Sequence, residues 1–165
     1  MRKVCIAVLL SVSVLSACHK TNNNCDYDAC AIKAPATEIT QLETYLTNAG
    51  ITATKHCSGI YYSISNAGAG ATASTCSYVS VTYKGSLTNG NVFDQTTAGP
   101  VAFPLATLIE SWKKGIPLIK KGGVITLYVP PSLGYGNSVQ SDRNGNVIIP
   151  ANSILIFEIT LMDVQ

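Results

Sequence analysis

The chain has 165 residues, a length that suits one domain with short additional segments. Only 12% of the residues are charged, and the formal net charge is +2. This near balance disfavours a nucleic-acid partner, because such binding depends on neutralising phosphates. The sequence contains no glycine-rich phosphate loop and no Cys-x-x-Cys motif, which disfavours nucleotide-dependent enzymes and thiol oxidoreductases.

The first 17 residues have the order of a signal peptide. Two basic residues precede an apolar run from Val4 to Leu15, which is shorter than the roughly 20 residues that span a bilayer. The sequence Leu15-Ser16-Ala17-Cys18 resembles a bacterial lipobox, so we expect residues 1–17 to be removed and Cys18 to carry lipid. An ordinary secretory signal with a chance cysteine is the alternative.

We therefore expect the mature protein to be held in the bacterial cell envelope by a lipid anchor. Removal of residues 1–17 takes Arg2 and Lys3 away and leaves nine basic residues against nine acidic ones. His19, rather than an aspartate, follows the lipidated cysteine, which by the sorting rule of other bacteria predicts the periplasmic face of the outer membrane. Residues 18–36 are rich in Asn, Thr and Ala, a composition that predicts a flexible tether.

Four cysteines follow the lipidation site: Cys25, Cys30, Cys57 and Cys76. An even number of cysteines in an exported protein indicates disulfides. We favour the pairs Cys25–Cys30 and Cys57–Cys76, because both loops are then short, although three pairings are possible. Zinc is a weaker interpretation, because the spacing lacks the pattern of a typical zinc site. We expect neither a metal nor a cofactor.

Residues 37–58 predict an accessory helix and a linker. Thr37 suits an N-cap and Gly50 a C-terminal stop. Between them lies an apolar stripe, made of Ile39, Leu42, Leu46 and Ala49. This helix is expected to pack on the domain or on a second copy of the chain, so the oligomeric state stays open.

Residues 59–165 predict one α+β domain. Val79, Val81 and Tyr83 alternate with polar residues, and this period of two, typical of strands, returns twice later in the chain. The expected elements are strands at 59–65, 79–83, 125–129 and 155–161, a mobile loop at 66–75, a turn at Asn89-Gly90 and a helix at 105–114. Together they predict a curved, mostly antiparallel half-barrel of sheet that is wrapped over the one short helix.

The charged residues give no sign of acid–base or nucleophilic catalysis. His19 and His56 lie outside the core of this domain, which disfavours a Ser-His-Asp arrangement, and the carboxylates are scattered, which disfavours glycosidase-like chemistry. Four lysines cluster near the end of the predicted helix, and we expect them to form a solvated rim: Lys113, Lys114, Lys120 and Lys121.

Several short motifs occur in a fixed order along the domain. They are Val81-Thr82-Tyr83-Lys84-Gly85-Ser86-Leu87, Asn89-Gly90, Phe93-Asp94, Leu108-Ile109 with Trp112 and Gly115, Leu133-Gly134-Tyr135-Gly136, Ile148-Ile149-Pro150-Ala151-Asn152 and Leu155-Ile156-Phe157. In this order they resemble the FK506-binding-protein (FKBP) family of peptidyl-prolyl cis-trans isomerases, from about Gly59 to Gln165.

The resemblance implies an aromatic pocket that accelerates rotation about X–Pro bonds in unfolded or partly folded proteins. It implies catalytic roles for Asp94, Tyr135, Phe93 and Phe157. It implies substrate-binding roles for Tyr83, Val101, Phe103, Leu108, Ile109, Trp112 and Ile149. Trp112 is then the floor of the pocket, and the Tyr135 hydroxyl and the Ile109 backbone N–H hold the carbonyl groups of the ligand. Macrocycles similar to FK506 or rapamycin are further expected ligands.

Two features depart from the family pattern. Val101 stands where the family usually has an aromatic residue, so one wall of the pocket is expected to be smaller. The segment 137–147 is longer and more polar than in the minimal family domain, and it flanks the pocket mouth. These departures leave an alternative open, in which the chain is a chaperone or binding module with little or no isomerase activity.

Overall fold

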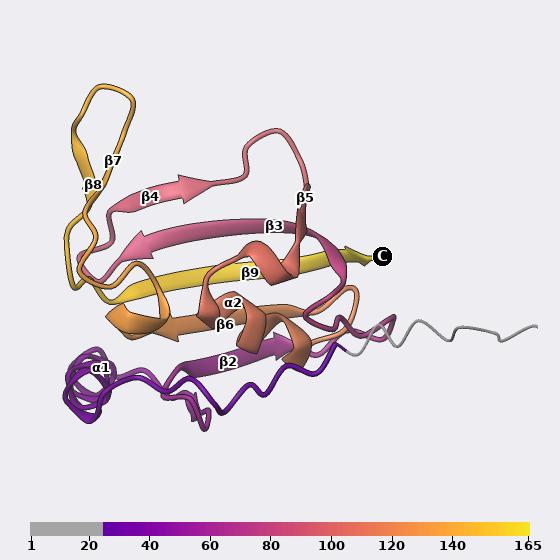
Figure 1. Cartoon of the computed structure of the whole chain (residues 1–165), viewed down its shortest axis with the longest axis horizontal. Helices are drawn as coiled ribbons and strands as arrows, with labels where there is room; N and C mark the ends of the chain where they lie inside the picture. The colour runs from indigo at the N-terminus through magenta and orange to yellow at the C-terminus, as the bar shows by residue number, and fades with distance from the viewer. Residues whose placement is uncertain (1–24) are drawn as a thin grey trace, which may run out of the picture.

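The computed structural model describes residues 25–165, and Figure 1 shows their arrangement. The predicted signal peptide, the lipidation site at Cys18 and residues 18–24 of the predicted tether lie outside the described residues. None of the helices within 25–165 has the length and apolar character needed to cross a membrane.

The domain is built on one seven-stranded antiparallel sheet. Its strand order is β1-β2-β6-β9-β3-β4, and β5 also pairs with β3. The strands of this sheet are β1 (Thr54–Lys55), β2 (Tyr61–Asn66), β3 (Tyr78–Leu87), β4 (Val92–Gln95), β5 (Val101–Pro104), β6 (Val124–Val129) and β9 (Leu155–Val164). A separate antiparallel hairpin contains β7 (Gln140–Ser141) and β8 (Val147–Ile149). The helical elements are α1 (Ala36–Asn48), η1 (Leu105–Thr107), α2 (Glu110–Gly115), η2 (Ile116–Leu118) and η3 (Pro131–Leu133).

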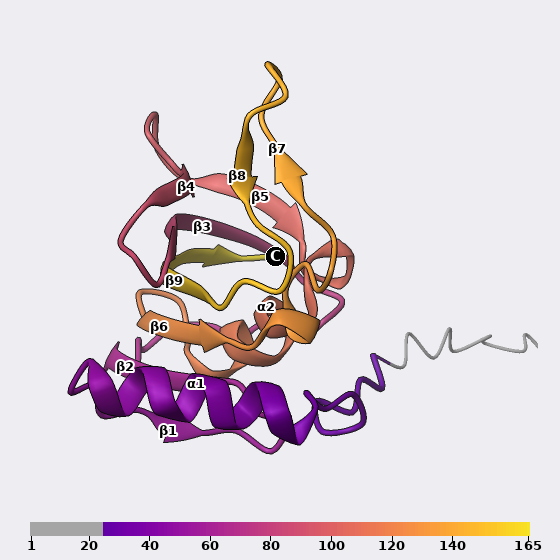
Figure 2. The same cartoon turned by 90° about the vertical axis from the view of Figure 1, so that its left-hand side faces the viewer.

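Helices α1 and α2 cover opposite faces of the sheet. Leu127 of β6 lies in the main core, where its side chain packs so close to Gly115 of α2 that a Cβ there would lie 2.5 Å from a Leu127 methyl carbon. The next residue, Tyr128, packs instead with Leu42 and Leu46 of α1. Successive residues of a strand point to opposite faces, so the two helices lie on opposite sides. Figure 1 shows α1 end on and β2 lengthwise, so the helix runs across the strand direction, and Figure 2 shows the length of the helix.

The predicted fold class is therefore confirmed: a curved antiparallel sheet, one helix in its hollow and an accessory helix outside. The period of two in β3, β6 and β9 reflects burial, because alternate residues of each strand enter the core. The short strands β1, β4, β5, β7 and β8 were not predicted, because two to four residues carry too little periodic signal.

The predicted helix at 105–114 is divided in two. Leu108 and Ile109 have extended backbones, with ψ of 171° and 154°, and they separate η1 from α2. The hydroxyl of Thr107 donates to the carbonyl oxygen of Pro104 (2.8 Å), and this hydrogen bond links the two ends of the η1 turn. The break places Leu108 and Ile109 in a link between the two turns rather than on a helix face.

The accessory helix differs from its prediction at its start and agrees at its end. α1 begins at Ala36, directly after Pro35, so Thr37 lies inside the first turn and is not the N-cap. Proline suits this position for two reasons. Its φ is fixed, here at −56°, and the N–H that it lacks would have no acceptor within the helix. The helix ends at Asn48, and Gly50 follows with φ of +66°, the left-handed conformation that stops many helices.

The described part of the predicted tether is fastened to the domain. Disulfides join Cys25 to Cys76 and Cys30 to Cys57, with Cα–Cα distances of 5.8 and 5.5 Å. The favoured local pairing was wrong, because the chain folds back so that residues 25–30 lie along the segments that carry the other two cysteines. Ala34 is buried, and its N–H donates to the carbonyl oxygen of Ser58 (2.9 Å). We call residues 25–34 the strap.

Candidate functional site

One cavity of about 180 Å³ opens between the hollow of the sheet and α2. Strands β3, β4, β5 and β9 supply its walls, α2 and the link before it supply its base, and the loop after η3 supplies one side of its mouth. The lining residues are Tyr83, Phe93, Asp94, Phe103, Leu108, Ile109, Trp112, Tyr135 and Phe157. The structure thus brings together nine of the eleven residues that the sequence predicted for a pocket.

Trp112 lies at the centre of the aromatic lining. Its ring meets Tyr83 and Phe157 edge to face, at centroid distances of 5.1 and 5.4 Å, and Phe103 at 6.2 Å. Edge-to-face contacts are the preferred geometry for such rings, so they hold one another in fixed orientations. The indole Nε1 is buried and has no hydrogen-bond partner among the described residues. A buried donor of this kind commonly marks a functional position or a bound water.

Gly85 of β3 makes room for two of these rings. A Cβ at this position would lie 2.5 Å from Phe93 and 3.0 Å from Phe157, whose rings pack edge to face at 5.6 Å. Any side chain here would therefore displace the wall of the cavity. The sequence signal for this requirement is the glycine within the Val81–Leu87 motif, although the motif alone does not say which rings approach it.

Among the described residues that line the cavity, one carries a carboxylate, and a tyrosine is hydrogen-bonded to it. The hydroxyl of Tyr83 donates to Oδ2 of Asp94 at 2.5 Å. Burial raises the pKa of Tyr83, and the hydrogen bond to the Asp94 carboxylate raises it further, so the phenol stays protonated. Burial also raises the pKa of Tyr135, with a smaller contribution from Asp94. Both hydroxyls therefore remain donors at neutral pH.

Two predicted substrate-binding residues do not line the cavity. Val101 pairs with Val81 at the start of β5 and is 41% exposed, because its short side chain ends in solvent. Ile149 is 3% exposed and belongs to the main core, so it supports the domain from inside. Val101 therefore forms no wall of this cavity, so the structure does not show the expected smaller wall at this position.

The long segment 137–147 folds into the β7–β8 hairpin, which projects from the body of the domain in Figure 2. Asp142 organises its tip: Oδ1 accepts hydrogen bonds from the backbone N–H groups of Asn144 (2.8 Å) and Asn146 (2.9 Å). Val139 and Val147 are 51% and 58% exposed on this hairpin. The segment is therefore an ordered projection that carries apolar side chains into solvent.

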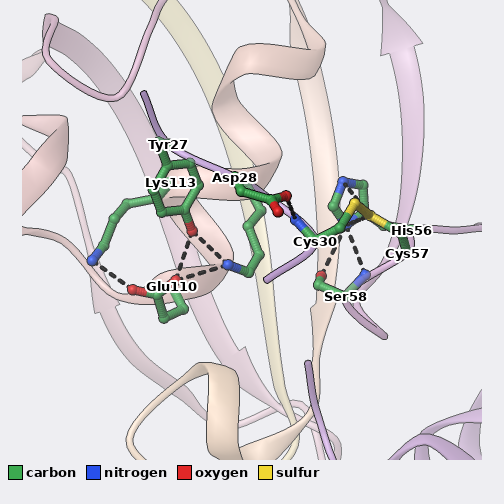
Figure 3. A network of polar contacts seen from close by, with 9 residues as sticks. Tyr27, Asp28, Cys30, His56, Cys57, Ser58, Glu110 and Lys113 are labelled. Carbon is green, nitrogen blue, oxygen red and sulfur yellow. Dashed lines mark hydrogen bonds and ion pairs between the residues drawn. A yellow bond between two sulfur atoms is a disulfide. The ribbon is translucent and has the colours of Figure 1, made fainter. Parts of the chain in front are cut away.

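A second polar cluster lies against α2, and sequence reasoning missed it (Figure 3). Lys114 was expected on a solvated rim, but it is 1% exposed, and its Nζ donates to Oε2 of Glu110 (2.7 Å) and to the hydroxyl of Tyr27 (2.5 Å). Tyr27 in turn donates to Oε2 of Glu110 (2.6 Å). No local pattern in the sequence indicates this cluster, because Tyr27 is 87 residues from Lys114.

Within the described chain, Cys30, His56 and Cys57 bring one potential metal-ligand atom each to within 4.8 Å of one another. The two cysteine sulfurs are bonded to each other, so neither is a thiolate that could bind a metal. His56 Nδ1 lies 2.8 Å from the Ser58 hydroxyl and accepts from the Ser58 N–H (3.2 Å). The group is therefore a disulfide beside a hydrogen-bonded histidine.

Comparison with solved structures finds similar domains in bacterial proteins. The crystal structure of FkpA from Escherichia coli has a TM-score of 0.65 at 35% identity and covers 79% of this chain and 58% of that one. A peptidyl-prolyl cis-trans isomerase from Pseudomonas syringae pv. tomato has a TM-score of 0.66 at 25% identity, covering 81% and 98%.

Comparison of sequences gives the same assignment. A "Probable FKBP-type peptidyl-prolyl cis-trans isomerase" of Haemophilus influenzae is 41% identical over 110 residues, which cover 66% of this chain and 44% of that protein. This chain thus matches less than half the length of that relative. The profile of the family "FKBP-type peptidyl-prolyl cis-trans isomerase" matches residues 70–162, more than half of the chain. The chain belongs to the FKBP-type peptidyl-prolyl cis-trans isomerase family.

Proposed function

We propose that the chain is a peptidyl-prolyl cis-trans isomerase that accelerates X–Pro rotation in proteins folding in the bacterial envelope. The observation that carries this proposal is the cavity over Trp112, in which aromatic rings surround one tethered carboxylate. Its size and apolar lining suit a five-membered prolyl ring. The family membership supports the same reaction.

The chemistry requires no nucleophile. Rotation about an X–Pro bond crosses a barrier of about 18–20 kcal/mol, because the amide resonance must be broken. Water stabilises the planar, polar amide more than the twisted one, so moving the bond into an apolar cavity lowers the barrier selectively. Phe93, Trp112 and Phe157 provide that environment.

Hydrogen-bond donors then hold the twisted geometry. Tyr135 keeps its proton and lies at the mouth of the cavity, 37% exposed, where it can reach a substrate carbonyl. Ile109 precedes the first turn of α2, where backbone N–H groups lack acceptors within the helix. Donors that favour the transition state raise the rate directly. A thousand- to hundred-thousand-fold acceleration needs about 4–7 kcal/mol, which desolvation and orientation together can supply.

The location of the reaction is part of the proposal. The lipobox-like sequence before Cys18 supports lipid anchoring, and His19 supports retention at the periplasmic face of the outer membrane. The anchor would place the domain beside chains that emerge at the membrane. Incorporation of labelled fatty acid into the full chain, lost in Cys18→Ala, tests this part. Unlabelled full-length protein would remove it.

A second candidate is a binding module with little turnover. The exposed side chain of Val101 and the exposed valines of the β7–β8 hairpin favour it, because they offer apolar surface to unfolded chains. FK506- or rapamycin-like macrocycles are proposed ligands of the cavity in either case.

Catalysis of a proline-limited refolding reaction separates the two candidates. The measurement uses residues 18–165 carrying Cys18→Ser, so that no lipid is needed, beside the variant Asp94→Ala/Phe157→Ala. We expect refolding to accelerate in proportion to the concentration of the parent and to lose this dependence with the variant. Suppression of aggregation without acceleration would instead establish the binding module.

A further inference from the structure

The strap is held to the domain on both sides of Tyr27. Cys25 is bonded to Cys76 and Cys30 to Cys57, so only a few residues separate each anchor from Tyr27. Beyond the second anchor, Ala34 is buried and hydrogen-bonded to Ser58. Covalent anchors remove most of the conformational freedom of such a short segment. The two disulfides therefore hold Tyr27 close to the domain.

From this position the Tyr27 hydroxyl closes a ring of three hydrogen bonds with α2. It donates to Oε2 of Glu110 (2.6 Å) and accepts from Nζ of Lys114 (2.5 Å), and Lys114 donates to the same Glu110 oxygen (2.7 Å). Nζ of Lys114 also lies 4.8 Å from the centroid of the Tyr27 ring, within the range of a cation–π contact. Figure 3 shows Tyr27 directed at Glu110.

The burial of this cluster makes each contact matter. The Lys114 side chain is 0% exposed and that of Glu110 is 21% exposed. A buried ammonium group needs partners for its protons, and among the described residues Lys114 finds them in the Glu110 carboxylate and in the hydroxyl and ring of Tyr27. Lys113 completes the cluster from the exposed side, donating to Oε1 of Glu110 (2.6 Å). Removal of the Tyr27 hydroxyl would leave Lys114 and Glu110 with one polar partner fewer each.

The same helix carries the base of the cavity. Glu110 directly follows Ile109, and Trp112 is two residues further on. α2 has six residues and no side-chain N-cap, and a helix this short is not stable by itself. Its orientation therefore depends on what packs against it, which is the sheet on one side and the strap on another.

We propose that Tyr27 is a positioning residue for the isomerase pocket: the strap fixes the first turn of α2, and thereby the Ile109 backbone and the Trp112 ring. This inference rests on the proposed function. Tyr27 does not line the cavity, so its effect would pass through its hydrogen bonds to Glu110 and Lys114. Small displacements of positioning groups can reduce catalysis far more than they reduce stability.

The test is Tyr27→Phe, which keeps the ring over Lys114 and removes only the hydroxyl. The matched control is Tyr78→Phe, at a tyrosine that is 56% exposed and does not line the cavity. Both are made in residues 18–165 with Cys18→Ser and measured well below the unfolding midpoint. We expect Tyr27→Phe to lower kcat/KM about threefold to tenfold and Tyr78→Phe to leave it unchanged. Trp112 is the only tryptophan of the chain, so its fluorescence and near-UV circular dichroism report on the base of the pocket.

Support requires both a lower kcat/KM and a changed Trp112 spectrum in Tyr27→Phe. If Tyr27→Phe keeps the kcat/KM or the Trp112 spectrum of the parent, the inference is wrong, even if the variant melts at a lower temperature. An equal loss of kcat/KM in Tyr78→Phe would also overturn it. If the parent itself has no isomerase activity, the proposed function fails separately. The Trp112 spectrum then decides the inference, since a strap that positions α2 must change it when the hydroxyl is removed.

Discussion

The hydroxyl of Tyr83 donates a 2.5 Å hydrogen bond to Oδ2 of Asp94, and this pair joins β3 to β4 at the wall of the cavity. The bond fixes the direction of the one carboxylate among the lining residues. It also keeps the phenol protonated, since burial and the carboxylate both raise the pKa of Tyr83. The pair thus gives the apolar cavity one polar edge with a defined orientation.

Tyr83→Phe tests the role of this edge. Loss of one hydrogen bond at this partly exposed position should lower the free energy of unfolding by about 1 kcal/mol. Because Asp94 then becomes mobile, we expect kcat/KM for a proline peptide to fall about threefold or more. Steady-state kinetics and urea unfolding measure the two effects. An unchanged kcat/KM would mean that the orientation of Asp94 is irrelevant to the reaction.

Gly85→Ala tests whether the aromatic wall is closely packed. The new methyl group would lie 2.5 Å from the Phe93 ring, so the ring must move or the strand must shift. Overpacking of this kind lowers the free energy of unfolding by about 1–3 kcal/mol. We expect Gly85→Ala to lose isomerase activity even under conditions in which it stays folded. Thr88→Ala, at an exposed position after β3, is the control. Equal activity in the two variants would contradict the described packing.

The charge state of Glu110 should appear in the pH dependence of stability. Burial alone would raise its pKa, but hydrogen bonds from Lys113, Lys114 and Tyr27 outweigh this effect and lower the pKa to about 2. A group with a depressed pKa stabilises the fold above its unfolded value, here 4.5, and this contribution is lost as the pH falls towards 2. Urea unfolding between pH 6 and about 2.5 should therefore give a steeper loss for the parent than for Glu110→Gln. If the free energy of unfolding falls equally steeply with pH in the two proteins, the pKa of Glu110 is not lowered in the folded state.

The disulfide pairing can be mapped directly. Proteolysis without reduction, followed by mass spectrometry, should yield peptides that join Cys25 to Cys76 and Cys30 to Cys57. The Cys25–Cys76 disulfide spans 51 residues, and the loop-entropy model predicts that a disulfide of this span stabilises the fold by about 4 kcal/mol. Cys25→Ala/Cys76→Ala should lower the free energy of unfolding by an amount of this order. Recovery of a Cys25–Cys30 peptide would contradict the strap.

The β7–β8 hairpin should matter for long substrates only. Val139 and Val147 are exposed on this hairpin, which projects from the domain in Figure 2, and neither lines the cavity, so they can contact an extended chain but not a short peptide bound there. In Val139→Ser/Val147→Ser we expect unchanged kcat/KM for a tetrapeptide and a severalfold lower value for an unfolded protein substrate. Equal effects on both substrates would place the valines in the structure of the pocket instead.

The sequence predicted the core of this fold because its strands alternate clearly. β3, β6 and β9 are long and half buried, so their periodicity follows directly from the burial of alternate residues. The order of short motifs then identified most of the residues that line the cavity. Val101 and Ile149 were the exceptions, because position in a motif does not reveal whether a side chain ends in solvent, in the core or in a pocket.

The strap could not be predicted, because its stability comes from distant contacts. Its polar composition is that of a flexible segment, and only the fold brings Cys25 to Cys76 and Tyr27 to Lys114. The same reason explains the error at Lys114, which has the sequence surroundings of a surface lysine but loses its solvent to the strap. Local patterns carry no information about such pairs.

Exchange NMR of a short peptide with one X–Pro bond tests the isomerase proposal most directly. Without a catalyst the two isomers exchange over tens of seconds, so a mixing time well below one second gives no cross-peaks between them. With a small amount of residues 18–165 carrying Cys18→Ser, we predict cross-peaks that grow with its concentration and vanish for Asp94→Ala/Phe157→Ala. A folded parent that produces no cross-peaks at any concentration would contradict the proposed activity.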